Sequence, residues 1–177
     1  MLDLLKRRRS IRKYTTKEIE KEKVLQLVQG ALLSPSSRNL RPWEFVVVED
    51  KAILEKLSSS KPGGGFLKNA QLGIVILGNP DISDVWIEDT SIASTIIHLL
   101  SYDLGLGSCW IQIRERNHNE SASAEEYIRL TLGIPENLKV LSILSIGYPD
   151  EAKSANNEED LNYEKVHLNT YGSKFVK

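Results

Sequence analysis

The sequence has few of the side chains that form disulfides or bind transition metals: one cysteine, one methionine and three histidines in 177 residues. The single cysteine, Cys109, cannot form an intramolecular disulfide, which fits a reducing compartment. Because the run 108–111 around it is typical of a buried strand, we interpret this thiol as packed rather than reactive. His98, His118 and His167 show no metal-ligand spacing, so we expect no metal site.

An excess of charge of either sign is also missing, since the net charge is -1 and the pI is about 6.3. No global field therefore directs the chain to nucleic acid or to an anionic membrane. The most apolar stretches, residues 72–78 and 140–147, are far shorter than the ~20 residues that cross a bilayer. The N-terminus has no apolar stretch of signal-peptide length. We expect a soluble cytoplasmic protein without nucleic-acid or membrane partners.

Hydrophobic periodicity predicts alternating helices and strands in one α+β domain. Thr16, with Glu18 and Glu20 after it, supplies an acidic start for a helix over about 19–33. Gly105 is expected to end the longest helix, as glycines commonly do. The polar tail from Asp150 onward has too few apolar residues to fold alone. After a short helix from Leu2, we expect helices at about 19–33, 51–58, 87–104 and 124–132, and strands at about 45–48, 72–77, 108–113 and 138–146.

A basic segment, Arg8-Arg9-Ser10-Ile11-Arg12, is the strongest local signal for binding. Guanidinium groups match phosphate oxygens in a bidentate fork, and a serine hydroxyl adds a neutral donor. Taken alone, the run is more typical of a solvated basic face than of a binding site, and it also fits a nucleic-acid-binding arm.

Two further segments could contact a polar, flat ligand. Between Pro35 and Trp43 the loop contains Ser36, Ser37 and Asn39, whose side chains suit a polar ring edge, although turn formers in a plain connection give the same composition. In the run 105–111, a glycine at position 107 lets the backbone approach a neighbouring group closely.

In this order and at these spacings, the segments resemble the nitroreductase family of FMN-dependent flavoproteins over about residues 4–149. The resemblance implies a single nitroreductase-like domain at 1–149, with a central, mostly antiparallel sheet flanked by helices, in an intertwined homodimer. It also implies that the extension at 150–177 packs on the partner subunit. The motifs are Arg8-Arg9-Ser10-x-Arg12, Pro35-Ser36-Ser37-x-Asn39-x-x-Pro42-Trp43, Gly105-Leu106-Gly107-Ser108-Cys109-Trp110-Ile111, Gly133-Ile134-Pro135 and Gly147-Tyr148-Pro149.

The resemblance further implies FMN at the subunit interface, reduced by NADH or NADPH and reoxidised in a ping-pong reaction by a nitroaromatic, a quinone or a related acceptor. No catalytic side chain is expected, since the flavin itself performs hydride transfer. The implied FMN contacts are Arg8, Arg9, Ser10 and Arg12 at the phosphate, ribityl chain or pyrimidine edge; Pro35, Ser36, Ser37 and Asn39 contributed by the second subunit; and the backbone of Trp110, Ile111 and Gln112 along the ring.

One departure from the family pattern concerns the phosphate. Members often place a further Lys or Arg in the C-terminal segment, whereas the comparable stretch here, 158–162, is acidic. Either Lys153 or Lys165 substitutes, or the N-terminal arginines act without that help. The roles of the Gly63–Gly65 loop and of Trp86 stay open, with Trp86 either over the flavin or packed in the core or dimer.

Two other functions remain as alternatives. One is a flavin-binding branch of the family with a different redox reaction or without turnover. The other is a nucleic-acid-binding protein that uses residues 6–13 as a basic arm, which the near-neutral net charge disfavours.

Overall fold

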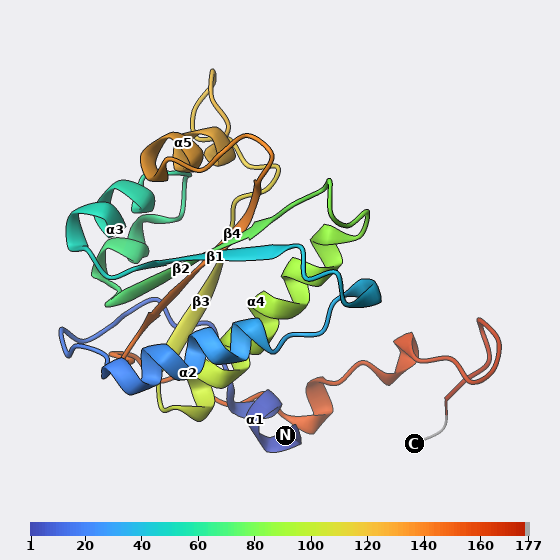
Figure 1. Ribbon diagram of the computed structural model, residues 1–177. Helices are drawn as coiled ribbons and strands as arrows, with labels where there is room; N and C mark the ends of the chain where they lie inside the picture. Colours follow the sequence, from blue (N-terminus) through green and yellow to red (C-terminus); the bar gives the residue numbers. More distant parts are fainter. Residues whose placement is uncertain (176–177) are drawn as a thin grey trace.

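The computed structural model describes residues 1–175 and consists of a four-stranded antiparallel sheet covered by helices on both faces (Figure 1). Each neighbouring pair of strands is antiparallel, in the order β1-β2-β4-β3. The predicted α+β arrangement is therefore confirmed. The strands are β1 (Trp43–Val48), β2 (Leu72–Gly78), β3 (Gly107–Gln112) and β4 (Lys139–Gly147).

The helices lie on two sides of this sheet. On one face α2 and α4 pack together, and on the other lie α3, α5 and the short 3-10 helix η2 (Gly65–Asn69). The predicted elements are all present, but α2 starts later than expected, at Lys21, with Glu20 as a cap whose side chain makes no capping bond. Thr16 is therefore not its start. The helices are α1 (Leu2–Arg7), α2 (Lys21–Leu32), α3 (Lys51–Ser58), α4 (Trp86–Asp103) and α5 (Ala124–Leu132).

The core lies on both sides of the two central strands. Every residue of β2 is buried, as is every residue of β4 after Lys139. Because both faces are covered, the strands need continuous apolar runs, which is the pattern that made them visible in the sequence. This rigid centre holds β3 at the edge of the sheet. Fully buried side chains include Leu27, Ile74, Ile97 and Leu144 beside α2 and α4, and Leu54, Val75, Ile128 and Ile143 beside α3 and α5.

The basic segment lies along the outer edge of β3. Ser10 forms an isolated parallel bridge with Ser108, and the Ile11 amide donates to the Ser108 carbonyl over 3.0 Å. A Cβ at Gly107 would lie only 2.8 Å from the Cβ of Ile11. The absence of a side chain at Gly107 thus makes room for Ile11, and our interpretation that it admits a flat ligand is wrong.

The C-terminal tail begins against the N-terminal segment and then leaves the body of the protein. The Asp150 amide donates to the Lys13 carbonyl and the Asn156 amide to the Lys6 carbonyl, each over 2.9 Å. Farther on, the 3-10 helices η3 (Glu158–Asp160) and η4 (Tyr163–Lys165) lie on the part of the tail that extends outward from the body of the protein (Figure 1). Its exposed apolar side chains are Leu161, Val166, Leu168, Tyr171 and Phe175.

Among residues 1–175, each helix is too short or too polar to cross a membrane.

Candidate functional site

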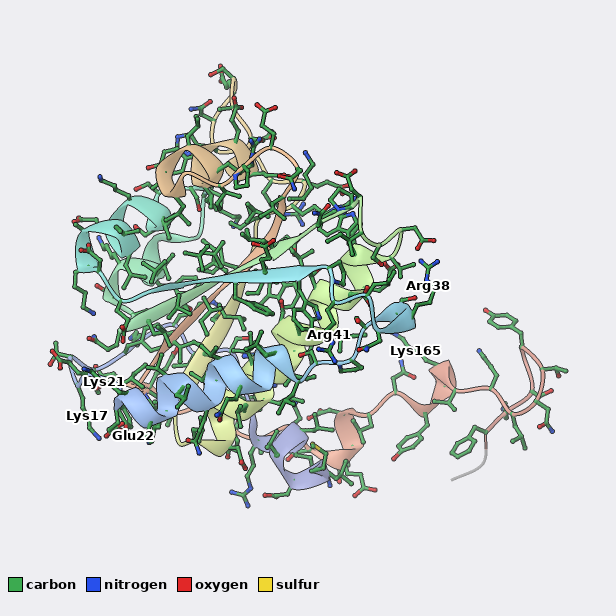
Figure 2. The ribbon with its side chains drawn as sticks, viewed as in Figure 1. Lys17, Lys21, Glu22, Arg38, Arg41 and Lys165 are labelled. Carbon is green, nitrogen blue, oxygen red and sulfur yellow. The ribbon has the colours of Figure 1, made fainter. Side chains whose placement is uncertain are left out.

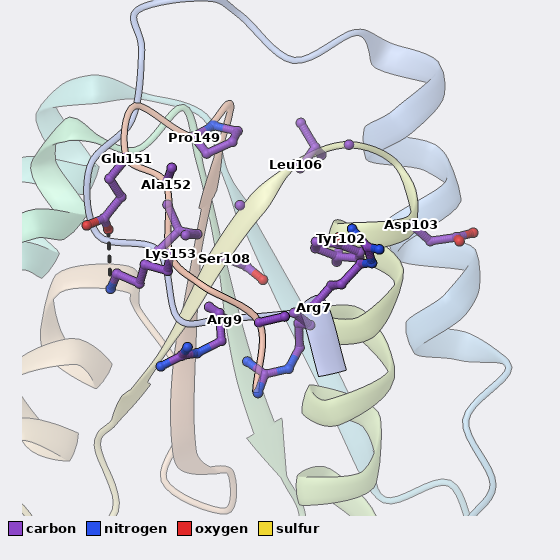
Figure 3. Close-up of a pocket in the computed structure, with 15 residues that line it drawn as sticks. Arg7, Arg9, Tyr102, Asp103, Leu106, Ser108, Pro149, Glu151, Ala152 and Lys153 are labelled. Atoms are coloured by element: carbon purple, nitrogen blue, oxygen red, sulfur yellow. Dashed lines mark ion pairs between the residues drawn. The ribbon is translucent and has the colours of Figure 1, made fainter. Parts of the chain in front are cut away.

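A cavity of about 460 Å³ lies where the basic segment, the end of α4, the start of β3 and the first part of the tail meet (Figure 3). In Figure 3, Glu151 and Lys153 form one side of it, and Arg7 and Tyr102 lie on the other. The N-terminal basic segment and the first part of the tail thus enclose a space beside the sheet edge. Its lining residues are Arg7, Arg8, Arg9, Ile11, Tyr102, Asp103, Gly105, Leu106, Gly107, Ser108, Pro149, Glu151, Ala152, Lys153 and Ala155.

The lining of the cavity is positively charged. Three arginines at positions 7–9 and Lys153 face two carboxylates, Asp103 and Glu151, so the formal charge is four minus two, or +2. Glu151 accepts from the Arg12 amide over 2.5 Å, and this contact is the main cause of the lowered pKa of its carboxyl group. Glu151 is also 3.5 Å from the Lys153 ammonium. An excess of guanidinium and ammonium groups in a concave site attracts a phosphate dianion.

Lys153, and not Lys165, is the tail lysine at the cavity. The Lys153 ammonium donates to the Ser10 carbonyl over 2.6 Å, which fixes the tail against the basic segment. Lys165 lies on η4 in the outward part of the tail (Figure 2). Within one chain the structure therefore brings Lys153, and not Lys165, to the cavity, while the choice between a lysine and the arginines alone stays a prediction.

Arg8 is held at the cavity by a histidine on α4. Its guanidinium Nη1 donates to Nε2 of His98 over 2.7 Å, and Nδ1 of the same ring lies 2.5 Å from the Ser108 hydroxyl. Burial, and secondarily the neighbouring Arg8 charge, lowers the pKa of His98 to about 4. The ring is thus neutral at pH 7. No spacing pattern indicates this contact, because Arg8 and His98 are 90 residues apart in the sequence.

The other residues of the basic segment have different surroundings. Arg9 lines the cavity and donates to the Ser154 carbonyl. Ser10 and Arg12 are not among the lining residues, and the Arg12 guanidinium carbon lies 5.7 Å from the centre of the Phe66 ring on η2. The segment therefore presents Arg8 and Arg9 to the cavity and Arg12 farther along the sheet edge.

On β3, the three predicted residues alternate in direction. The Ser108 carbonyl points outward to Ile11, so the alternation of a strand directs the backbone groups of Trp110 and Gln112 outward as well. Ile111 faces β4, where it pairs with Ile143, and its side chain is buried. The outer edge of β3 thus offers the amides of Trp110 and Gln112 beside the basic segment.

The loop at residues 34–42 is pinned at the start of α4. The buried Asp89 carboxylate accepts from the Ser37 amide over 2.8 Å and from the Ser83 hydroxyl over 3.0 Å. The Ser36 hydroxyl accepts from the Arg41 amide over 2.8 Å. The loop also contains three non-glycine residues in the left-handed region, a strained conformation that is concentrated at functional sites. They are Arg38, Asn39 and Arg41, with φ values of 51°, 56° and 51°.

This loop and the cavity are at opposite ends of α4. Asp89 and Tyr102 are thirteen residues apart on the helix, which is about 20 Å at 1.5 Å per residue. Figure 2 shows Arg38 and Arg41 at the loop end. Pro35, Ser36, Ser37 and Asn39 therefore do not join Arg8 within one chain, and their contribution through a partner subunit stays a prediction.

Trp86 is part of the core side of α4. A Cβ at Gly78 on β2 would lie 2.4 Å from a ring carbon of Trp86, so the ring packs directly on that strand. This supports core packing over a position above a ligand. The Gly63–Gly65 loop leads into η2, and thus to the Phe66 ring beneath Arg12.

Replacing Gly107 with alanine is expected to destabilise the protein by about 1–3 kcal/mol, the usual cost of overpacking. The new methyl group would collide with Ile11 and push the basic segment away from β3. Urea unfolding measures the loss. Gly65→Ala is the matched control, because a Cβ there meets nothing within 4 Å among the described residues. Equal stability of the two variants would contradict the close contact.

Comparisons with known proteins agree with this fold. A profile described as the nitroreductase family matches residues 5–62. A protein of Archaeoglobus fulgidus, provisionally named an NADH dehydrogenase/NAD(P)H nitroreductase, is 36% identical over 94% of this chain and 95% of its own. The solved structure of an FMN-dependent nitroreductase from Clostridium difficile R20291 has a TM-score of 0.95 and 52% identity, covering 97% of this chain and 100% of that one. A structure from Clostridium acetobutylicum, provisionally titled an NADH oxidase, has a TM-score of 0.87 and 31% identity over 96% and 100% of the two chains.

Proposed function

The chain belongs to the nitroreductase family, and from this membership we propose that it is an FMN-dependent oxidoreductase that takes electrons from NADH or NADPH. The observation that carries the proposal is the cavity with a formal charge of +2 beside the outer edge of β3. The relatives named for FMN and for NAD(P)H support the two cofactors.

The residues present fit FMN in charge and in hydrogen bonding. A phosphate group needs cationic donors, and Arg8, Arg9 and Lys153 supply them at one cavity. The edge of a flavin ring carries nitrogen and oxygen atoms that need hydrogen-bond partners. The outward backbone groups of Trp110 and Gln112 supply such partners at the edge of β3.

In this proposal the protein binds and orients, and the cofactor reacts. When bound, FMN supplies the hydride and electron transfer. Arg8 and Lys153 hold the phosphate, while the edge of β3 fixes the ring. Arg12 is the cation available to stabilise negative charge on the ring, since its guanidinium is exposed beside that edge. No side chain is assigned as a general acid or base.

We place nitroaromatic compounds, quinones and related molecules as the electron acceptors. The nitroreductase names of the relatives support the first class, and the NADH oxidase title supports tolerance of other acceptors. We expect a ping-pong mechanism, because a single flavin must first be reduced by NADH or NADPH and then be reoxidised by the acceptor.

We also propose that the functional unit is a homodimer, in which residues 150–177 of each chain pack on the partner. Apolar side chains on α2 and α4 are exposed in the single chain, as are those of the outward tail, and covering them favours association. The pinned loop at 34–42 gains a role only if it reaches the cavity of a second chain. The exposed residues of the two helices are Leu25, Leu32, Ile92 and Tyr102.

One experiment tests cofactor, assembly and turnover together. Protein purified with added FMN is expected to sediment as a yellow species of twice the 20.0 kDa chain mass. Its visible absorbance should bleach with NADH or NADPH and return with a quinone or a nitroaromatic compound. Protein that stays colourless after FMN addition would contradict the proposal, and a yellow monomer would contradict the shared site. Yellow dimer that does not bleach would identify the flavin-binding branch without turnover.

A further inference from the structure

His98 lies between two residues that the cavity needs, and its geometry fixes the state of its ring. Arg8 can only donate hydrogen bonds, so Nε2 of His98, 2.7 Å from the guanidinium, must be an acceptor with a free lone pair. The proton of the neutral imidazole is then on Nδ1, which donates to the Ser108 hydroxyl over 2.5 Å. The reverse tautomer would place an N–H against a guanidinium N–H.

We propose that His98 is a positioning residue for phosphate binding, because its Nδ1–H tautomer holds the Arg8 guanidinium at one ring nitrogen and the Ser108 hydroxyl at the other. The inference rests on the proposed function, since it assigns the anion in this cavity to the FMN phosphate. It adds Ser108 to the binding residues as a neutral donor.

The Ser108 hydroxyl is made available by this arrangement. It accepts the Nδ1 proton, so its own hydrogen is free to point elsewhere. The His98 carbonyl, 3.5 Å away, is at the limit of a hydrogen bond. Because Ser108 lines the cavity, this hydrogen can be donated to a phosphate oxygen.

A neutral imidazole suits this position better than a charged side chain. A carboxylate would hold Arg8 but cancel its charge, and an ammonium group would repel it. The imidazole orients the guanidinium while leaving its full charge for the ligand. Of the five guanidinium donors, His98 takes one, so the others can form the fork that matches phosphate.

The surroundings favour the neutral ring. Burial and the adjacent Arg8 lower the pKa of His98 to about 4, so the ring stays neutral across the physiological range. Arg8 is the charged group in contact with it among residues 1–175. The other charged groups that line the same cavity are Arg7, Arg9, Asp103, Glu151 and Lys153.

Flavin specificity tests the proposal. His98→Leu is expected to weaken FMN binding by about threefold to tenfold, the loss of one hydrogen bond, while riboflavin, which has no phosphate, binds within about twofold of wild type. His98→Gln should recover most of the FMN affinity, because its amide can both accept and donate. Fluorescence quenching during titration gives the Kd values.

His118→Gln is the matched control. Its ring nitrogen faces the Ser59 and Ser60 carbonyls and its ring stacks on Tyr127, away from the cavity lining. FMN and riboflavin should bind this variant as they bind wild type. Equal losses of both flavins in His98→Leu, or an unchanged FMN affinity, would overturn the positioning role.

The tautomer can be measured without any flavin. Nitrogen-15 NMR of wild-type protein labelled at histidine should show a neutral Nδ1–H ring at pH 7, assigned by its disappearance in His98→Gln. An Nε2–H ring or an imidazolium would overturn the inference even if FMN binds. If wild type binds no FMN, the proposed function fails, and the ring state still decides whether His98 holds Arg8 and Ser108.

Discussion

Replacing Arg8 with alanine is expected to weaken FMN binding by about 1.5–3 kcal/mol, the range for a hydrogen bond to a charged group. This corresponds to roughly a 10–150-fold increase in Kd. Arg8 lines the cavity and is already oriented by His98, so its loss removes a pre-positioned charge rather than a mobile one. The loss should exceed that of His98→Leu, which leaves the guanidinium in place but unrestrained.

Equilibrium titration with FMN and riboflavin separates this effect from general damage. Riboflavin affinity should change little in Arg8→Ala, since the arginine is assigned to the phosphate. Arg116→Ala serves as the control, because Arg116 is exposed and its side chain donates locally, to the neighbouring Glu115 carbonyl. Unchanged FMN retention in Arg8→Ala would mean that the phosphate binds elsewhere.

Acid is expected to destabilise the protein through His98 by about 3 kcal/mol, since one unit of pKa shift is about 1.4 kcal/mol. The pKa falls from 6.5 to about 4 on folding, so the unfolded chain binds more protons between these values. Stability therefore rises with pH across this window. The penalty is absent above pH 7, grows as the pH falls through 6.5, and is complete below 4.

Urea unfolding at a series of pH values measures this linkage. His98→Gln removes the titrating ring, so its stability should depend less steeply on pH between 4 and 6.5 than that of wild type. Other groups, including Glu151 with its lowered pKa, are shared by both proteins and cancel in the comparison. Parallel curves for the two proteins would contradict the buried neutral ring.

The sequence was sufficient for the fold where local chemistry decides the structure. The apolar run of β2 is buried at every position, and α4 ends just before Gly105, whose φ of 75° suits glycine. Sequence reasoning failed for the start of α2 and for Gly107. In both cases the outcome depends on what packs against the backbone, and Ile11 is distant from Gly107 in sequence.

The candidate site was predictable where residue type and short spacing identify its members. Arg8 and Arg9 were found from residue type and spacing, and they do line one cavity. His98 and Asp89 were missed because each acts through a partner on a remote segment, Arg8 and Ser37 respectively. A lone histidine or carboxylate in a helix has no spacing that reveals such a partner. The proposed contribution of the 34–42 loop to a second chain rests on the family resemblance, since no pattern within one chain indicates it.

The contacts between the basic segment and the first part of the tail also have a consequence for biosynthesis. Arg9 bonds to Ser154 and Lys153 to Ser10 across 145 and 143 residues, so one wall of the cavity is translated long before the other. The earlier wall is therefore incomplete until residues 149–155 have left the ribosome. A cofactor that needs both walls can therefore bind only after that segment has emerged, and a chain truncated before Ala152 would lack Ala152, Lys153 and Ala155 of the lining.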